Sequence, residues 1–212
     1  AALDLQDQYR NTALMLAAVK GHREVVQELV RAGAALDLQD EAQYAALTLA
    51  AMTGCTEVVQ ELVRAGAALD LQDEDQNIAL ILAACSGHTA VVQELMRAGA
   101  ALDLQDSNQQ TGLQKAAAVG HTEIVQELVR AGAALDLRDD VGNTALMVAA
   151  CNGHKEIVRE LVRAGAALDL QGTQQWTALM WAACYGHTEV IRELVRAGAA
   201  LDLQDTWQNT AL

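Results

Sequence analysis

Hydrophobic and polar positions repeat along this chain with a fixed period of 33 residues. The stretch GCTEVVQELVRAGAALDLQD at residues 54–73 returns with small changes in the other copies. A fixed period of about 20 to 50 residues indicates a solenoid in which each unit stacks on the next. The phase of the repeat is marked by Asp4, Asp37, Asp70, Asp103, Asp136, Asp169 and Asp202.

Two short helices are predicted within the first complete repeat. Thr12 can cap a helix over residues 13–19, because its hydroxyl oxygen can accept from the free amides of the first turn, and Gly21 ends that helix. A second helix is expected over about residues 23–32, with Gly33 in the left-handed conformation after it. Its apolar side chains recur at the spacing of one helical face: Val25, Val26, Leu29 and Val30.

The segment 34–43 that follows is short and polar, which predicts an extended, hairpin-like connection to the next repeat. On the solvent side of the second helix, Glu28 and Arg31 are three residues apart and are expected to pair. The same Glu–Arg spacing returns in the later repeats. A solvated, ion-paired face is therefore predicted along the second helices.

Composition and charge narrow the classes of function. The chain has 14 Lys and Arg against 28 Asp and Glu, and its net charge of −14 repels phosphate backbones and anionic membrane surfaces. Nucleic acid and membranes are thus poor partners, and a basic protein is favoured. No apolar run reaches the roughly 18 residues needed to cross a bilayer, and AALDLQD lacks the regions of a signal peptide. A soluble, cytoplasmic protein is expected.

The four cysteines show no CxxC pair and no metal-ligand spacing. Cys151 and Cys184 share one slot of adjacent repeats, but stacked helices lie about 8–10 Å apart, whereas a disulfide needs Cα atoms within roughly 7 Å. Free thiols are therefore predicted at Cys55, Cys85, Cys151 and Cys184, which suits a reducing compartment.

The stretch NTALMLAAVKGHREVVQELVRAGAALDLQD resembles an ankyrin repeat, with its Ala-Ala, Gly-His, Val-Val and Gly-Ala elements in the family's order. The resemblance covers essentially the whole chain. It implies an all-α, ankyrin-repeat solenoid of antiparallel helix pairs with β-hairpin-like loops, whose concave face of loop tips and first helices binds proteins. A single array over residues 1–212 is expected, with full repeats at 7–39, 40–72, 73–105, 106–138, 139–171 and 172–204 and partial repeats at 1–6 and 205–212.

The chain departs from the family pattern at identifiable positions. The proline expected at the first helical position is absent throughout, and the turn glycine is retained only at Gly142, which predicts strain at the other loop tips. Ala45 and Ile78 replace the capping threonine, and Gly112 weakens a first turn. Repeats two to four are thus expected to open before repeats five and six.

Variable slots separate a candidate binding face from the framework. On the first helices, one face holds Leu16, Val19 and Lys20, and its first slot also accepts Lys115 and Trp181 in later repeats. A core slot could hardly accept Leu, Lys and Trp in turn, so this face is predicted to be at least partly open. The candidate partner-binding residues are Tyr9, Lys20, Tyr44, Met52, Lys115, Asn152, Trp176, Trp181, Tyr185 and Trp207.

Trp and Tyr are enriched at interface hot spots, and Trp176, Trp181, Tyr185 and Trp207 are expected to gather near the C-terminal end. The alternative is that Trp181 fills a gap left by small neighbours and that Trp207 is isolated at an exposed end. Lys115 is interpreted as a charge at the edge of the face rather than as a catalytic lysine.

Five histidines occupy one slot: His22, His88, His121, His154 and His187. Residues in successive layers about 8–10 Å apart cannot share a metal ion, so these side chains are predicted to brace the loops by hydrogen bonds. No nucleophile, base and orienting group converge, and no phosphate-binding glycine loop precedes a helix. The expected function is protein recognition without catalysis, cofactor or metal.

Two alternatives stay open. The chain could be an internal spacer of a longer array, with end-to-end self-association through uncapped terminal repeats that leave stacking surfaces such as Ala211 and Leu212 exposed. A near-uniform framework with variation at surface slots also suits an engineered binder, a consensus design or recent duplication of one natural unit.

Overall fold

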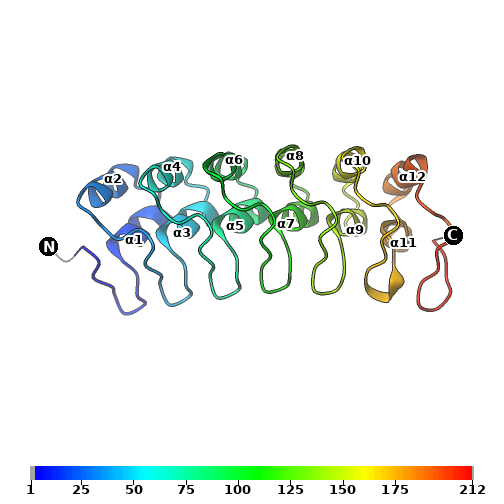
Figure 1. Ribbon diagram of the computed structural model, residues 1–212, viewed down its shortest axis with the longest axis horizontal. Coiled ribbons are helices and arrows are strands. Elements are labelled where there is room, and N and C mark those ends of the chain that lie inside the picture. The colour runs from blue at the N-terminus through cyan, green and yellow to red at the C-terminus, as the bar shows by residue number, and fades with distance from the viewer. Residues whose placement is uncertain (1–2, 212) are drawn as a thin grey trace. The chain divides into compact units, whose positions relative to one another are not determined.

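A computed structural model describes residues 3–211, and this part of the chain contains twelve α-helices arranged in pairs (Figure 1). The first helices of the pairs are α1 (Ala13–Val19), α3 (Ala46–Met52), α5 (Ala79–Ser86), α7 (Gly112–Val119), α9 (Ala145–Cys151) and α11 (Ala178–Cys184). The second helices are α2 (Arg23–Arg31), α4 (Thr56–Arg64), α6 (Thr89–Ala98), α8 (Thr122–Arg130), α10 (Lys155–Arg163) and α12 (Thr188–Ala197). No helix in this part of the chain is both long enough and apolar enough to cross a membrane.

The chain divides into two compact units at Ser107 and Asn108, each with three helix pairs. In the first unit, α1, α3 and α5 pack in one row and α2, α4 and α6 in a second, with each pair also in contact internally (Figure 1). The first helices are rich in alanine, and Ala50, Ala51, Ala83 and Ala84 are fully buried. Because alanine is small, the helices approach closely and the core forms between repeats rather than within one.

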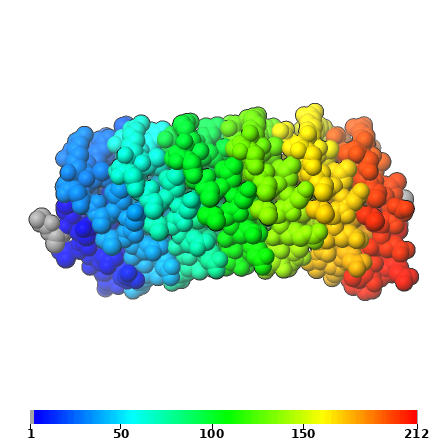
Figure 2. All heavy atoms as spheres, viewed as in Figure 1, coloured from blue at the N-terminus to red at the C-terminus, as the bar shows by residue number. Residues whose placement is uncertain are grey.

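The second unit has the same construction. Helices α7, α9 and α11 form one row, and α8, α10 and α12 form the other. Both rows contribute buried side chains to its core. Leu146 from α9 and Val158 and Leu161 from α10 are all at most 1% exposed. Figure 2 shows the repeats of each unit in sequence order along the colour scale, packed against one another.

The local helix signals act as the sequence predicts. Helix α1 spans Ala13–Val19, and the Thr12 hydroxyl accepts from the Met15 amide at 3.3 Å. Helix α2 ends at Arg31, and Gly33 follows with a φ of 88°, in the left-handed region. Ala45 and Ile78 make no capping bond from their side chains. The all-α fold, these helix limits and the two missing caps are therefore confirmed.

The projecting loops contain no β-strand among the described residues. Turns held by an aspartate close the loops at residues 7–11, 40–44, 73–77, 139–143 and 205–209, whereas the loop before α11 has Gly172 in that slot and forms a short 3-10 helix, Thr173–Gln175. Asp7 is the model for this arrangement: its carboxylate accepts from the Tyr9 and Asn11 amides, both at 2.8 Å. The backbone amide of Asn11 in particular holds the pKa of Asp7 below its ordinary value of 3.8. The connections are hairpin-like in path, and side-chain-to-backbone bonds replace a strand ladder.

The strain predicted at the loop tips is present. The turn slot adopts positive φ both at Gly142, with 83°, and where the residue is not glycine, as at Gln43 with 61° and Gln76 with 60°. Left-handed backbone costs a non-glycine residue roughly 1–2 kcal/mol, so these tips store unfavourable energy. The side-chain amide of Gln39 donates a hydrogen bond to the Gln43 carbonyl at 2.6 Å, which partly offsets the energy of the left-handed conformation.

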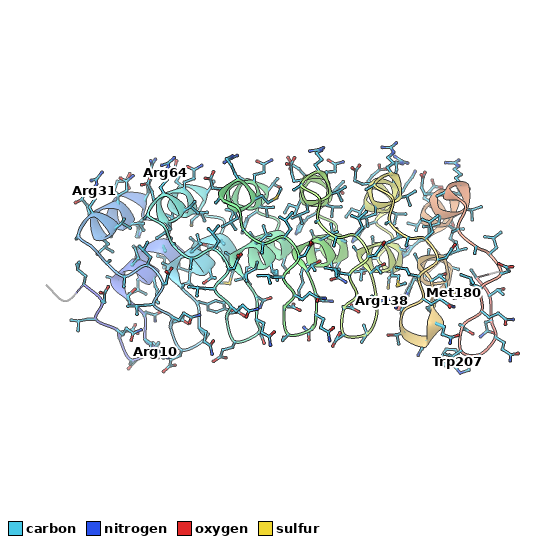
Figure 3. The ribbon with its side chains drawn as sticks, in the orientation of Figure 1. Arg10, Arg31, Arg64, Arg138, Met180 and Trp207 are labelled. Carbon is cyan, nitrogen blue, oxygen red and sulfur yellow. The ribbon has the colours of Figure 1, made fainter. Side chains whose placement is uncertain are left out.

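Five of the six second helices carry the predicted Glu–Arg ion pair, whereas Glu160 of α10 forms no ion pair within the described residues. Arg64 pairs with Glu61 at 3.0 Å, and the corresponding pair joins Arg31 to Glu28. Figure 3 shows Arg31 and Arg64 projecting from α2 and α4 on the side away from the loops. Exposed pairs of this kind contribute only about 0.3–0.5 kcal/mol each. This face is solvated, as expected, and its acidic and basic residues are nearly equal in number.

The histidine slot braces neighbouring repeats. The Nε2 atoms of His88, His154 and His187 lie 3.1, 3.1 and 2.9 Å from carbonyl oxygens at the end of the preceding repeat's first helix. Because a carbonyl can only accept, each Nε2 carries the proton and donates. The bracing prediction is confirmed for these three, with the contact made between repeats rather than within one loop.

Candidate binding surface

The variable slots of the first helices and the loop tips lie on one side of each unit, which we call the loop face. In the first unit it comprises the loops 7–11, 40–44 and 73–77 together with the outward slots of α1, α3 and α5. Most of these slots are open, as predicted: Leu16 is 50% exposed, and Lys20 is exposed. Leu49 is the exception, because it is only 8% exposed. The prediction of an open slot is therefore wrong at Leu49. Its helix, α3, packs between α1 and α5, whereas Leu16 lies on α1, which packs against only one neighbouring first helix in this unit.

Among the described residues, no aromatic contact joins Tyr9 and Tyr44, the two candidate rings of the first unit. Tyr9 is 57% exposed at the first loop tip, and Lys20 lies at the end of α1. Tyr44 and Met52 are half-buried. Burial raises the pKa of Tyr44, and the carboxylates of Asp73, Asp75, Asp40 and Glu74 raise it further. The environment of the Tyr44 ring is thus strongly acidic.

The second unit brings three of its candidates together. The Trp176 and Trp181 ring centroids are 4.6 Å apart with planes at 64°, an edge-to-face contact. Trp181 stacks on Tyr185 at 6.1 Å, and Tyr185 on His187 at 6.3 Å. Tyr185 is 56% exposed, whereas both tryptophans are half-buried. We call Trp176, Trp181 and Tyr185 the aromatic cluster; it runs from the loop before α11 to the end of that helix.

A cavity of about 90 Å³ opens beside the aromatic cluster, between α9 and α11. Burial, together with the neighbouring Cys184 thiol, raises the pKa of the Cys151 thiol, which stays protonated and neutral. The lining carries no ionisable charge at neutral pH. It consists of Asn143, Met147, Val148, Cys151, Asn152 and Trp181.

The remaining candidates are not members of the aromatic cluster, although Asn152 lines the cavity beside it. Asn152 is exposed at the end of α9, where its side-chain amide donates to the Val148 carbonyl at 3.0 Å. Lys115 is half-exposed on α7. Trp207 is 59% exposed at the last loop tip (Figure 3), and within residues 3–211 its ring contacts no other aromatic ring. The expected gathering of four aromatic residues is thus observed for three.

Charge is distributed unequally over each unit. In the first unit, the segment before α1 and the segments that follow α2, α4 and α6 together hold eleven acidic residues and one basic residue, Arg10. In the second unit the corresponding segments hold six acidic residues and one basic residue, Arg138. The second helices of both units together hold eleven acidic and ten basic residues. Nearly all of the net negative charge therefore belongs to the loops.

Some residues that shape this surface were not singled out by sequence reasoning. Asn143 and Met147 line the cavity but sit in slots that the periodic pattern assigns to the framework. The spacing Asp-x-x-x-Asn could have identified Asn143, because it recurs at residues 7–11, 73–77 and 205–209, where the aspartate closes the loop. No comparable signal marks Met147.

The loop face carries charged, aromatic and apolar side chains. Within the described part of the chain, no three or more His, Cys, Asp or Glu side chains are grouped to hold a metal ion. The four cysteines are free thiols. What the loop face offers instead is carboxylates, exposed aromatic rings and a small apolar cavity, the features of a surface that binds another macromolecule.

Comparison with known proteins identifies the family to which the chain belongs. A family model of ankyrin repeats, in three copies, matches residues 1–75, 47–139, 80–172 and 113–205. The chain therefore belongs to the ankyrin repeat family, whose domains are protein–protein interaction modules, and the resemblance noted in the sequence is confirmed. No curated protein matches the sequence.

Two solved structures illustrate the similarity. The human ASB11 ankyrin repeat domain is 26% identical with a TM-score of 0.86, over 95% of this chain and 90% of that one. The ankyrin repeat domain of Bcl-3, described as a unique member of the IkappaB protein family, is 29% identical with a TM-score of 0.87, over 95% of this chain and 92% of that one.

Proposed function

We propose that this protein recognises a basic protein partner through the loop face, without catalysis or cofactor. The observation that carries the proposal is the separation of charge. The loops hold an excess of fifteen formal negative charges, whereas the second helices are close to neutral. A surface of one sign steers a partner of the opposite sign and orients its approach. The four free thiols favour a reducing, cytoplasmic setting for this interaction.

The test compares two variants with the same change in charge. The loop variant carries Glu41→Gln, Glu74→Gln and Asp75→Asn, all exposed residues of the first unit's loops. The control carries Glu24→Gln, Glu57→Gln and Glu123→Gln, all exposed on second helices. Proteins captured by the parent chain are identified by mass spectrometry and compared in isoelectric point.

We expect a captured basic protein that elutes with salt, is retained by the control and binds the loop variant at least tenfold more weakly. Equal retention by both variants would remove the loop face from the proposal. Capture of acidic proteins alone would reject the partner's charge.

End-to-end self-association is a second candidate, favoured by apolar exposure on the first repeat. Leu16 and Val25 are 50% and 49% exposed on α1 and α2. Sedimentation at increasing protein concentration should show reversible assembly that Leu16→Glu with Val25→Glu abolishes. A monomer at every concentration would eliminate this candidate.

A further inference from the structure

The cavity beside the aromatic cluster has features that specify what it can hold. Its volume of about 90 Å³ is well below the roughly 150 Å³ of an engineered cavity that binds benzene, so an aromatic side chain does not fit. A branched aliphatic group of three or four carbons does. The lining of Met147, Val148, Cys151 and the Trp181 ring is largely apolar, and it includes no carboxylate.

Charge must therefore stay outside the cavity. A lysine or arginine inserted there would lose water without gaining a counter-ion, which is strongly unfavourable. Asp140 is exposed in the same loop as the cavity-lining Asn143, and this loop has the excess negative charge shared by the loop face. A basic residue next to the inserted side chain would meet Asp140 at the surface, where the pair stays hydrated.

Two atoms of the lining residues also lack a hydrogen bond. The Oδ1 of Asn143 and the indole Nε1 of Trp181 are covered, and neither has a partner within the described structure. Buried polar groups are nearly always paired, so an unpaired acceptor and an unpaired donor beside one cavity need an explanation. The Asn143 oxygen lies against Gly172, whereas a small rotation of the Trp181 ring on binding would let its indole N–H donate to a main-chain carbonyl of a bound peptide.

We propose that the second unit binds an extended segment of the partner in which a Leu- or Val-type side chain enters the cavity beside Trp181 while a flanking Lys or Arg meets Asp140. This inference rests on the proposed function and specifies the partner's sequence at this site. It also separates the roles of the two units. The first unit contributes mainly charge, and the second contributes an apolar anchor.

The experiment uses the full chain and labelled synthetic peptides of Lys and Ser with one variable central residue, Leu, Ala, Trp or Asp. Binding is measured by fluorescence anisotropy. We expect the Leu peptide to bind about tenfold or more tightly than the Ala peptide, as burial of one aliphatic side chain implies. The Trp and Asp peptides should show no gain over Ala.

The variants assign the effect to the cavity. Trp181→Val places the side chain that α9 has in the same slot, Val148, so the fold should tolerate it, and thermal unfolding checks this. It should remove the preference for Leu over Ala and leave the weaker, salt-sensitive binding. Asp140→Asn should weaken all basic peptides alike. Val195→Ala, at an exposed apolar residue of α12 in the same unit, is the control and should change neither.

Each other outcome decides against the inference. Equal binding of Leu and Ala peptides would eliminate the anchor while leaving charge-driven recognition intact. Tightest binding of the Trp peptide would show stacking on the rings rather than insertion. No binding of any peptide would reject a short linear segment, whereas the proposed function itself is judged separately by the captured proteins and the loop variant.

Discussion

At the scale of single residues, the joint between repeats depends on pairs that are 34 positions apart. The ring of His187 lies against Gly153, where a Cβ would come within 2.7 Å of Nδ1, and its Nε2 donates to the Cys151 carbonyl. Gly54 receives His88 in the same way, with a Cβ at 2.6 Å. Glycine is thus required at this position for two reasons. It leaves room for the histidine ring, and it adopts a positive φ without strain.

These two roles can be separated experimentally. Gly153→Ala should destabilise the protein by about 2–3 kcal/mol, because left-handed alanine costs roughly 1–2 kcal/mol and the displaced imidazole loses a hydrogen bond of about 1 kcal/mol. Gly186→Ala is the matched control, with φ of 71° against 73° and no atom within 4 Å of its Cβ. Urea unfolding should therefore show the smaller loss for Gly186→Ala. Equal losses would mean that the histidine contact contributes nothing.

Sequence and structure agree best at this scale where a rule is local. The capping role of Thr12 and the left-handed Gly33 follow from chain-local geometry and are confirmed. Leu49 could not be predicted, because the same residue type in the same slot is 50% exposed at Leu16 and 8% at Leu49. Exposure there is decided by how many repeats lie alongside.

At the scale of helices, the first helices differ in how their N-termini are held. Thr111 accepts from the Gln114 amide at 3.3 Å, and the Gln114 side chain accepts from the Thr111 amide at 2.8 Å. Gln114 also donates to the carbonyls of Leu137 and Asn143. This network offsets the weakness expected from Gly112 in α7. The sequence could not show it, since the equivalent slot holds methionine in three other repeats, at Met15, Met147 and Met180.

This difference in N-terminal capping indicates which first helix should open earliest. Helix α5 has Ile78 at its cap and Ile81 one turn on, so neither side chain can accept from a free amide. Native-state hydrogen exchange should show the amides of α5 opening ahead of those of α9 and α11, by about 1 kcal/mol for a missing cap. Helix α7 should exchange with the slower group, and Gln114→Met should move it to the faster one. Faster opening of α9 and α11 would contradict this order.

At the scale of the whole molecule, the aromatic cluster and its cavity illustrate the limit of prediction from sequence. Variation among repeats located Trp176, Trp181 and Tyr185, because framework slots do not tolerate such changes. The cavity instead arises from a difference in size between Val148 and Trp181 in equivalent slots of neighbouring repeats. Its volume depends on the rotation of both side chains and on the packing of Met147, which no periodic pattern encodes.

The ion-paired carboxylates of the second helices predict how the stability of the fold depends on pH. Hydrogen bonding to Arg159, which lies 3.1 Å away, holds the pKa of Glu193 below its ordinary value of 4.5, and hydrogen bonding to Lys155 lowers that of Glu189. A carboxyl whose pKa is lower in the folded protein than in the unfolded chain stabilises the fold above its unfolded pKa. This contribution is lost as the pH falls through the folded pKa. Stability should thus hold from neutral pH to about pH 4.5 and then decline.

Glu193→Gln should reduce this decline, because the glutamine does not titrate and the linked protons are no longer taken up on unfolding. Glu160→Gln is the matched control in the same unit, since Glu160 forms no ion pair within residues 3–211. Urea midpoints followed by circular dichroism at a series of pH values would measure the effect. The pH slope of Glu160→Gln should follow that of the parent chain, while that of Glu193→Gln should be shallower below pH 4.5. If all three slopes coincide, the paired carboxyls of the second helices do not control acid stability, and the loop carboxylates closed onto backbone amides, such as Asp7, become the groups that do.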